Sequence, residues 1–323
     1  MTDAPGRDRK VWVAGHTGLV GSAVVRRLAA LGHGRVVVAT RAELDLRDRV
    51  AVRAFVRAER PEVVVMCAGT VGGIVANSTY PADFIHDNLA MELAVVAEAQ
   101  AAGVRDLMLL GSSCIYPRDC PQPIREEYLL TGPLEPTNRP YAVAKIAGAE
   151  LCWALNRQHG TRYVVPMPCN LYGPSDHYDL EKSHVLPALI RRMHEARERG
   201  DAAVTLWGTG RPRRELLHVD DLARACVMLL DLPPEAHPTV FPAGAAPVIN
   251  IGAGTDQTIR ELAELTARVV GFRGRLDWDT SRPDGTPQKL LETSRMRALG
   301  WRPEIPLAEG IAGAYRDMLA RYH

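Results

Sequence analysis

The chain has 323 residues, which suffices for one large domain or two modest ones. Its hydrophobic fraction of 46%, charged fraction of 24% and formal net charge of +1 are those of an ordinary soluble globular protein. They give no electrostatic reason to expect nucleic acid or a membrane as a partner. The polar N-terminus, the absence of a long apolar run and six scattered cysteines predict a cytoplasmic protein without structural zinc or another metal site.

The first predicted strand, residues 10–14, runs into a glycine-rich turn and then an amphipathic helix over residues 22–31. This context is typical of a dinucleotide site. Gly15 would permit the tight turn, Gly18 would let the backbone approach a pyrophosphate, and Gly21 would let the helix pack closely. The alternative is a glycine turn without a ligand. The residues expected to contact the cofactor here are Gly15, His16, Thr17, Gly18, Leu19, Val20 and Gly21.

A second predicted strand, residues 35–39, ends where such a site selects its cofactor. A carboxylate at this position favours NAD, whereas an arginine accommodates the 2′-phosphate of NADP. Arg41 stands there and no carboxylate occupies the strand tip, which indicates NADP(H), with NAD(H) as the alternative. Arg41 could equally be a solvated loop residue. Asp45 and Leu46 are expected at the adenine rim.

Strands and helices then alternate, with helices predicted over residues 50–59 and 81–102 and strands over residues 62–67 and 107–111. This alternation predicts an α/β fold with a Rossmann-type doubly wound parallel sheet. Ligands of such sheets lie outside the carboxyl ends of the strands. Ser112 and Cys114 follow a strand directly, so they are candidates for the site.

Tyr141 and Lys145 are four residues apart, and a helix is predicted over residues 142–158; if Tyr141 is helical as well, the two side chains lie on one face. An ammonium beside a phenol lowers the pKa of the phenol, so the pair can exchange a proton with a substrate oxygen. In isolation this spacing more often marks an ordinary surface helix. The strand-and-glycine context favours the catalytic interpretation.

The second half of the chain shows a weaker pattern. Helices are predicted over residues 183–199, 219–230, 258–271, 295–299 and 307–322, strands over residues 203–207 and 248–252, and a loop over residues 233–247. We expect a dinucleotide-binding domain from residues 1–170 plus a returning segment of about 216–250. Residues 171–215 and 251–323 would form a smaller, discontinuous α/β substrate-binding domain, with the substrate in the cleft between the two.

These motifs together resemble those of the extended short-chain dehydrogenases/reductases, and longer strings resemble the GDP-L-fucose synthase family over nearly the whole chain. The strings are VGGIVAN (71–77), YPADFI (80–85), LGSSCIYP (110–117), LEPTN (134–138), YAVAKIAG (141–148), NLYGP (170–174), SHVLPAL (183–189), RELLHVDD (214–221) and PDGTP (283–287).

The resemblance implies NADPH-dependent conversion of GDP-4-keto-6-deoxy-D-mannose to GDP-L-fucose, by epimerisation at C3 and C5 and reduction of the C4 ketone. It implies Ser112, Tyr141 and Lys145 as the reductase triad, and Cys114 and His184 as the base and acid of epimerisation. It also implies a homodimer built on the helices 81–102 and 142–158. Further contacts implied for the cofactor are Tyr141, Lys145, Asn170 and His184, and for the GDP-sugar Asn170, Arg192, Trp207, Arg214 and Lys289.

Departures from the family pattern keep alternatives open. Family members commonly carry arginine where this chain has Thr17 and Ala39, which leaves Arg41 to bind the 2′-phosphate, and lysine where it has Thr70. The rival interpretations are an epimerase or epimerase/reductase for another 4-keto nucleotide sugar, and a non-catalytic nucleotide-sensing Rossmann protein. His218 is expected to have an architectural role.

Overall fold

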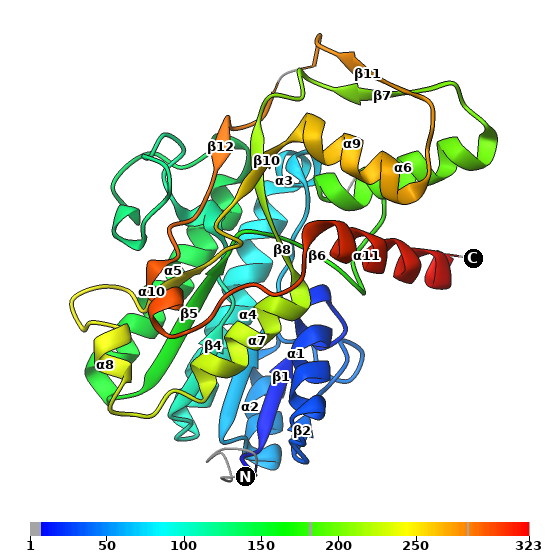
Figure 1. Ribbon diagram of the computed structural model, residues 1–323. Helices are drawn as coiled ribbons and strands as arrows, with labels where there is room; N and C mark the ends of the chain where they lie inside the picture. The colour runs from blue at the N-terminus through cyan, green and yellow to red at the C-terminus, as the bar shows by residue number, and fades with distance from the viewer. Residues whose placement is uncertain (1–7, 181–182, 283, 323) are drawn as a thin grey trace.

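The core of the fold is a six-stranded, wholly parallel sheet in the order β2-β1-β3-β4-β5-β9 (Figure 1). The computed structural model describes residues 8–180, 183–282 and 284–322, so residues 1–7 and residue 283 of the PDGTP string lie outside it. The sheet confirms the expected Rossmann-type α/β fold. Its strands are β1 (Val11–Ala14), β2 (Val36–Val37), β3 (Val63–Met66), β4 (Asp106–Leu109), β5 (Arg162–Pro168) and β9 (Val248–Ile251).

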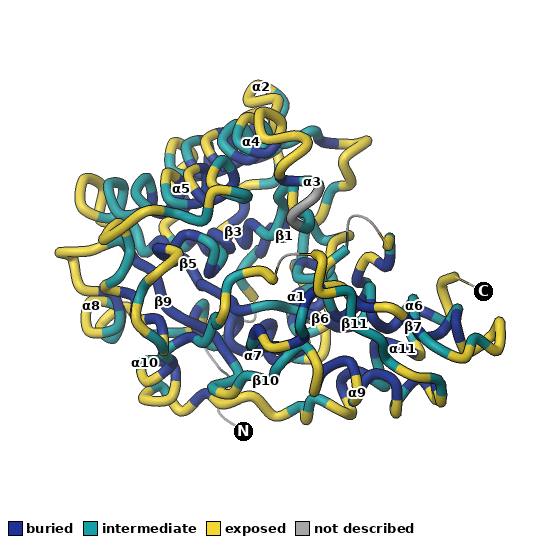
Figure 2. The backbone as a smooth tube through the Cα atoms, turned by 90° about the horizontal axis from the view of Figure 1, so that it is seen from above, coloured by how far each residue is buried: buried dark blue, intermediate teal, exposed yellow. Residues whose placement is uncertain are grey.

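The central strands are almost continuously apolar because helices cover both faces of the sheet. On one face lie α1 (Leu19–Ala30) and α7 (Val219–Leu230) (Figure 2). On the other lie α2 (Arg49–Glu59), α4 (Pro81–Ala101) and α5 (Arg139–His159), with α4 packed along α5. None of the described helices is long and apolar enough to cross a membrane.

The strand order reverses between β1 and β3, and this reversal positions the site. Neighbouring loops diverge at such a point and leave a crevice above the sheet. Gly15, directly after β1, has φ +90°. A Cβ there would lie 2.6 Å from the backbone nitrogen of Ala68, which lies in the loop that follows β3. The two loops therefore approach each other at the backbone, which a larger residue would prevent.

A second unit with its own hydrophobic core stands over the carboxyl ends of the sheet (Figure 1). Its four-stranded sheet places Lys289 opposite Arg214 in the parallel pairing of β12 with β8. The strands of this unit are β6 (Asn170–Tyr172), β7 (Ala203–Trp207), β8 (Arg213–His218), β10 (Asp256–Thr258), β11 (Arg275–Asp279) and β12 (Gln288–Lys289), and its helices are α6 (Val185–Arg199), α9 (Ile259–Val270) and α11 (Leu307–Tyr322).

Several elements differ from those predicted. The structure adds the strands β6, β8, β10, β11 and β12, shortens β2, and begins α1 at Leu19 rather than at residue 22. Met296 and Trp301 pack in the larger core, although the sequence assigned their segment to the substrate-binding domain. The remaining short helices are α3 (Ile74–Thr79), α8 (His237–Val240) inside the predicted loop 233–247, α10 (Ser294–Ala298) and the 3-10 turns Ser113–Ile115, Glu126–Tyr128 and Pro136–Asn138.

Candidate active site

A cleft of about 460 Å³ opens at the carboxyl ends of β1, β3 and β4. It extends from the glycine turn, past Tyr141 and Lys145, to Cys114 and His184. Ligand sites in proteins commonly have volumes of this order. One continuous cavity thus contains the predicted dinucleotide turn and the predicted catalytic side chains.

The glycine turn has the geometry of a phosphate site. Gly18 precedes α1 as its N-cap and no side chain of the described residues caps the helix, so the first N–H groups of α1 are available to an anion. A Cβ on Gly18 would meet nothing closer than the Gly15 carbonyl oxygen at 3.6 Å, whereas a Cβ on Gly21 would lie 2.1 Å from that oxygen. Gly18 therefore faces open space and Gly21 allows close packing. Thr17, Leu19 and Val20 line the cleft, but His16 is absent from its lining.

Arg41 lines the cleft at the end where the sequence predicts the adenosine of the cofactor, and Ala39 lines it too. Its side chain is exposed and has no hydrogen-bond or ion-pair partner among the described residues. An unpaired guanidinium after β2 fits the 2′-phosphate of NADP, for which its forked donors are suited. Thr17 also lines this cavity, and neither Thr17 nor Ala39 supplies a positive charge.

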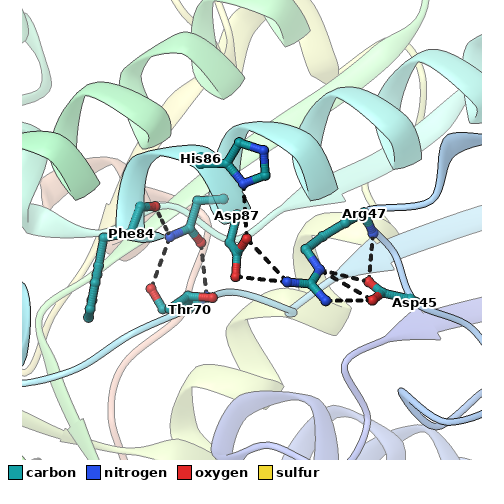
Figure 3. Close-up of polar contacts among 7 residues, drawn as sticks. Asp45, Arg47, Thr70, Phe84, His86 and Asp87 are labelled. Carbon is teal, nitrogen blue, oxygen red and sulfur yellow. Dashed lines mark hydrogen bonds and ion pairs between the residues drawn. The ribbon is translucent and has the colours of Figure 1, made fainter. Parts of the chain in front are cut away.

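Arg47, which the sequence analysis did not single out, bridges the β2–α2 loop to α4 (Figure 3). Its guanidinium donates to Asp45 at 2.7 Å and lies 3.3 Å from the carboxylate of Asp87. The Arg47 hydrogen bonds lower the pKa of Asp45 to about 2. Asp45, Arg47 and Asp87 all line the cleft, so this bridge forms part of its wall near Arg41.

Asn88, which follows Asp87 in α4, holds the backbone of the turn after β3 in place. Its side-chain oxygen accepts from the Thr70 N–H at 3.0 Å, and its amide donates to the Thr70 carbonyl at 2.9 Å and the Phe84 carbonyl at 2.7 Å. Figure 3 shows Thr70 and Phe84 in this network. Both backbone groups of Thr70 are therefore held at the wall of the cleft by one buried side chain.

The three predicted reductase residues come together. Ser112 follows β4 and caps a 3-10 turn, where its Oγ accepts from the Cys114 N–H at 3.3 Å. Tyr141 and Lys145 lie one turn apart on α5, with the ammonium 6.0 Å from the centre of the tyrosine ring. Burial raises the pKa of Tyr141, and this outweighs the lowering by Lys145 and by a hydrogen bond from Ser112. The net direction is opposite to that expected from the spacing alone, and it keeps the phenol protonated, which is the form that donates.

Cys114 and His184 reach the far end of the cleft from separate segments. The Lys289 ammonium, on β12, donates to the Cys114 sulfur at 3.9 Å. His184 is the residue before α6, and its surface faces the cleft. Desolvation by the surrounding protein lowers the pKa of His184.

The remaining predicted sugar-nucleotide residues lie on the second unit, beyond the lining of the cleft. The Arg214 guanidinium donates to the Thr286 carbonyl at 2.7 Å, and burial lowers the pKa of Arg214. Trp207 is 59% exposed, and the Arg282 guanidinium lies 5.1 Å from its ring centre. Arg192 donates to the Thr205 carbonyl at 3.2 Å. Asn170, in contrast, lines the cleft itself.

Two further polar residues of this region, Asn138 and Asp284, were not among the site residues predicted from the sequence. Asn138 lines the cleft, and its side-chain oxygen is buried without a hydrogen-bond partner in the described part of the chain. Asp284 accepts from the Thr209 N–H at 2.9 Å and its hydroxyl at 2.7 Å. Asp284 belongs to the PDGTP string, which marked the segment but not the residue.

His218 accepts a hydrogen bond from the Asp220 N–H through its Nδ1 and so caps α7, which is the architectural role expected for it.

Residues 11–252 match the family model of the NAD dependent epimerase/dehydratase family. The chain belongs to this family. Among curated members, the probable GDP-L-fucose synthase 1 of Oryza sativa subsp. japonica is 54% identical over 95% of this chain and 91% of that protein. The GDP-L-fucose synthase of Escherichia coli K12 is 49% identical over 96% of this chain and 97% of its own.

Solved structures of similar proteins have the same fold. A GDP-6-OMe-4-keto-L-xylo-heptose reductase from C. jejuni aligns with a TM-score of 0.91 at 34% identity, over 98% of this chain and 99% of its own. A GDP-L-fucose synthetase from Naegleria fowleri bound to NADP aligns with a TM-score of 0.85 at 27% identity, over 98% and 95%. Family membership and the assembled side chains support an enzyme rather than a nucleotide-sensing protein.

Proposed function

We propose that this enzyme converts GDP-4-keto-6-deoxy-D-mannose to GDP-L-fucose, by epimerisation at C3 and C5 followed by reduction at C4 with NADPH. The observation that carries the proposal is that one cleft contains two sets of side chains. Ser112, Tyr141 and Lys145 suit carbonyl reduction, and Cys114 and His184 suit proton transfer at carbon. GDP-L-fucose synthases at about half identity over nearly the whole chain support the same substrate.

The cofactor that fits the cleft is NADP(H). The uncapped first turn of α1 and the open space at Gly18 suit the pyrophosphate, and the unpaired Arg41 suits the 2′-phosphate. The NADP-bound relative of the same fold supports this assignment. When bound, the cofactor supplies the hydride for C4 of the sugar. Asn170 and His184, which line the same cleft, are proposed to contact both the cofactor and the sugar end.

In epimerisation the C4 ketone acidifies the hydrogens on C3 and C5. A base removes each proton from one face and an acid returns one from the other face. We assign these roles to Cys114 and His184, with the Lys289 ammonium stabilising negative charge on the sulfur. The oxygen at C4 gains negative charge as the proton leaves, and the hydroxyls of Ser112 and Tyr141 are positioned to donate to it.

In reduction the same two hydroxyls hold the C4 carbonyl, and Tyr141 gives its proton to the oxygen as the alcohol forms. Because its pKa is raised, Tyr141 enters this step protonated. Arg192, Trp207 and Arg214 are proposed to hold the GDP portion, since guanidinium groups bind diphosphate and an exposed indole offers a stacking face.

A second candidate is reduction or epimerisation of another GDP-4-keto sugar. The heptose reductase of similar fold and the Thr70 departure motivate it. One assay separates the two: purified protein with GDP-4-keto-6-deoxy-mannose and either NADPH or NADH, following cofactor absorbance and identifying the product by NMR. Formation of GDP-L-fucose with one cofactor oxidised per sugar supports the first proposal. No turnover with either cofactor, combined with turnover of a GDP-4-keto-heptose, supports the second.

We further propose a cytoplasmic homodimer. The six cysteines are free thiols, as a reducing compartment would keep them. Leu93 on α4 and Val143 on α5 are exposed on the two helices expected to form a four-helix interface. Sedimentation of the purified protein tests the dimer, and a monomer at micromolar concentration would reject it.

A further inference from the structure

A buried ion pair lies behind the reductase residues, between α4 and α5. The Lys145 ammonium is 2.9 Å from Glu92 Oε1 and donates to the Leu110 carbonyl, also at 2.9 Å. The side chains of Lys145 and Glu92 are only 4% and 2% exposed. Lys145 lines the cleft, whereas Glu92 does not, so Glu92 can act on the reaction only through its neighbours.

The helix carrying Lys145 is shaped to admit this carboxylate. Gly148 is three residues further along α5, and a Cβ there would lie 2.3 Å from Glu92 Oε2 and 2.7 Å from Leu109 Cδ2. A glycine inside a helix costs about 1 kcal/mol relative to alanine. Both carboxylate oxygens of Glu92 are buried without a hydrogen-bond partner among the residues described, so the ion pair with Lys145 at 2.9 Å is the contact that balances this carboxylate.

Stability does not explain this arrangement. Replacing a buried ion pair by apolar side chains of similar volume is often neutral or stabilising. The glycine at position 148 and the unsatisfied carboxylate of Glu92 add to the free-energy cost of keeping the ion pair. What the pair provides is an ammonium held in one place, directly behind Tyr141, with its charge balanced inside the protein.

We propose that Glu92 is a positioning residue for the C4 reduction: it anchors the Lys145 ammonium and keeps the Lys145–Tyr141 pair fully protonated until the ketone takes the tyrosine proton. This inference rests on the proposed reductase function. It assigns to α4 a part in the chemistry that the α5 motif does not reveal.

The electrostatics of the neighbouring groups support this role. Burial acts to lower the pKa of Lys145, but Glu92 and Tyr141 outweigh it and the pKa of Lys145 is raised. Burial raises the pKa of Tyr141, and Glu92 adds to that. The titratable groups that face Lys145 and Tyr141 are Glu92 on α4, Cys67 after β3 and Cys114 after β4. Lys145 and Tyr141, both on α5, also act on each other.

Glu92→Gln tests the charge while preserving the shape. The amide oxygen can still lie beside the Lys145 ammonium, but the negative charge is gone, so both protons of the pair are held less tightly. Whichever proton leaves first, the alkaline limb of kcat for reduction should move to lower pH by about one unit. On the neutral plateau kcat should stay within about threefold, and KM for NADPH should hardly change.

Two further variants separate charge from packing. Glu92→Asp retains the charge in a smaller side chain and should keep the alkaline limb near its wild-type position. Glu98→Gln is the matched control, because Glu98 lies on the same helix and pairs with Arg49 and Arg53 at 2.6 and 2.9 Å, away from Lys145. It should leave the pH profile unchanged, whatever it does to stability.

A substrate-free measurement keeps this test independent of the sugar proposal. In ¹³C-tyrosine-labelled protein, the Tyr141 signal is identified as the one missing from Tyr141→Phe, and its titration midpoint should also fall in Glu92→Gln. An unchanged midpoint and profile, or a displacement to higher pH, would overturn the role of Glu92. A wild-type protein that does not turn over GDP-4-keto-6-deoxy-mannose would instead reject the proposed substrate, while the titration still decides the role of Glu92.

Discussion

Glu215 of β8 should make the protein less stable as the pH rises towards neutrality. Its side chain is 1% exposed and accepts from the Gly254 N–H at 2.7 Å and the Leu291 N–H at 2.9 Å. Burial nevertheless raises the pKa of Glu215 from 4.5 to about 7. Between these two values the folded chain binds a proton that the unfolded chain has lost, so the free energy of unfolding falls as the pH rises.

The size of this effect follows from the two pKa values. With 1.36 kcal/mol per pKa unit, the contribution of Glu215 declines by about 2.5 kcal/mol between about pH 5 and about pH 8, where almost none of it remains. Glu215→Gln cannot titrate, so its unfolding free energy should lack this part of the decline. The absolute stability of the variant can change through altered hydrogen bonds, but only the difference in slope is at issue.

The assay is urea unfolding of both proteins, followed by far-UV circular dichroism at several pH values across this range. Comparing slopes between the proteins removes the titration of groups that both retain, including Asp176, whose pKa burial also raises to about 7. Two parallel curves of unfolding free energy against pH would refute the reasoning, because they would show that Glu215 is ionised in the folded state throughout.

Three predictions concern the active site directly. Tyr141→Phe should lower the rate of ketone reduction by about 10²- to 10⁴-fold, because it removes the proton donor, while NADPH affinity measured by fluorescence stays within a few-fold. Cys114→Ser should suppress solvent deuterium incorporation at C3 and C5, followed by NMR without cofactor, by at least about a hundredfold; normal exchange would remove Cys114 from the role of base. Arg41→Ala should raise KM for NADPH about tenfold and leave KM for NADH unchanged, since one charge-assisted contact with the 2′-phosphate is lost; equal effects on both cofactors would place Arg41 elsewhere.

The features predicted correctly from the sequence are those that one continuous segment determines. The glycine turn and the Tyr141–Lys145 pair depend on neighbours within a few residues, where helical and strand periodicities apply. The long buried strands were also recognisable, because strands covered on both faces are continuously apolar.

The missed features depend on contacts between distant segments. Lys145 meets Glu92 from another helix, and Lys289 meets Cys114 across 175 residues, so no local spacing indicates either contact. β12 has only two residues, too few for any periodicity, and exists because β8 offers it a partner. The direction of the Tyr141 pKa was misjudged for a similar reason, since burial is a property of the assembled fold.

The pairing of β12 with β8 has a consequence for biosynthesis. The half of the cleft proposed to bind the dinucleotide uses residues from Gly15 to Lys145, whereas Lys289 lies 175 residues beyond Cys114 and reaches it only after that stretch has been made. Domains tend to form from the N-terminus as synthesis proceeds. During translation, the nucleotide half can therefore assemble first, and a nascent chain stalled before residue 289 would carry Cys114 without its neighbouring ammonium.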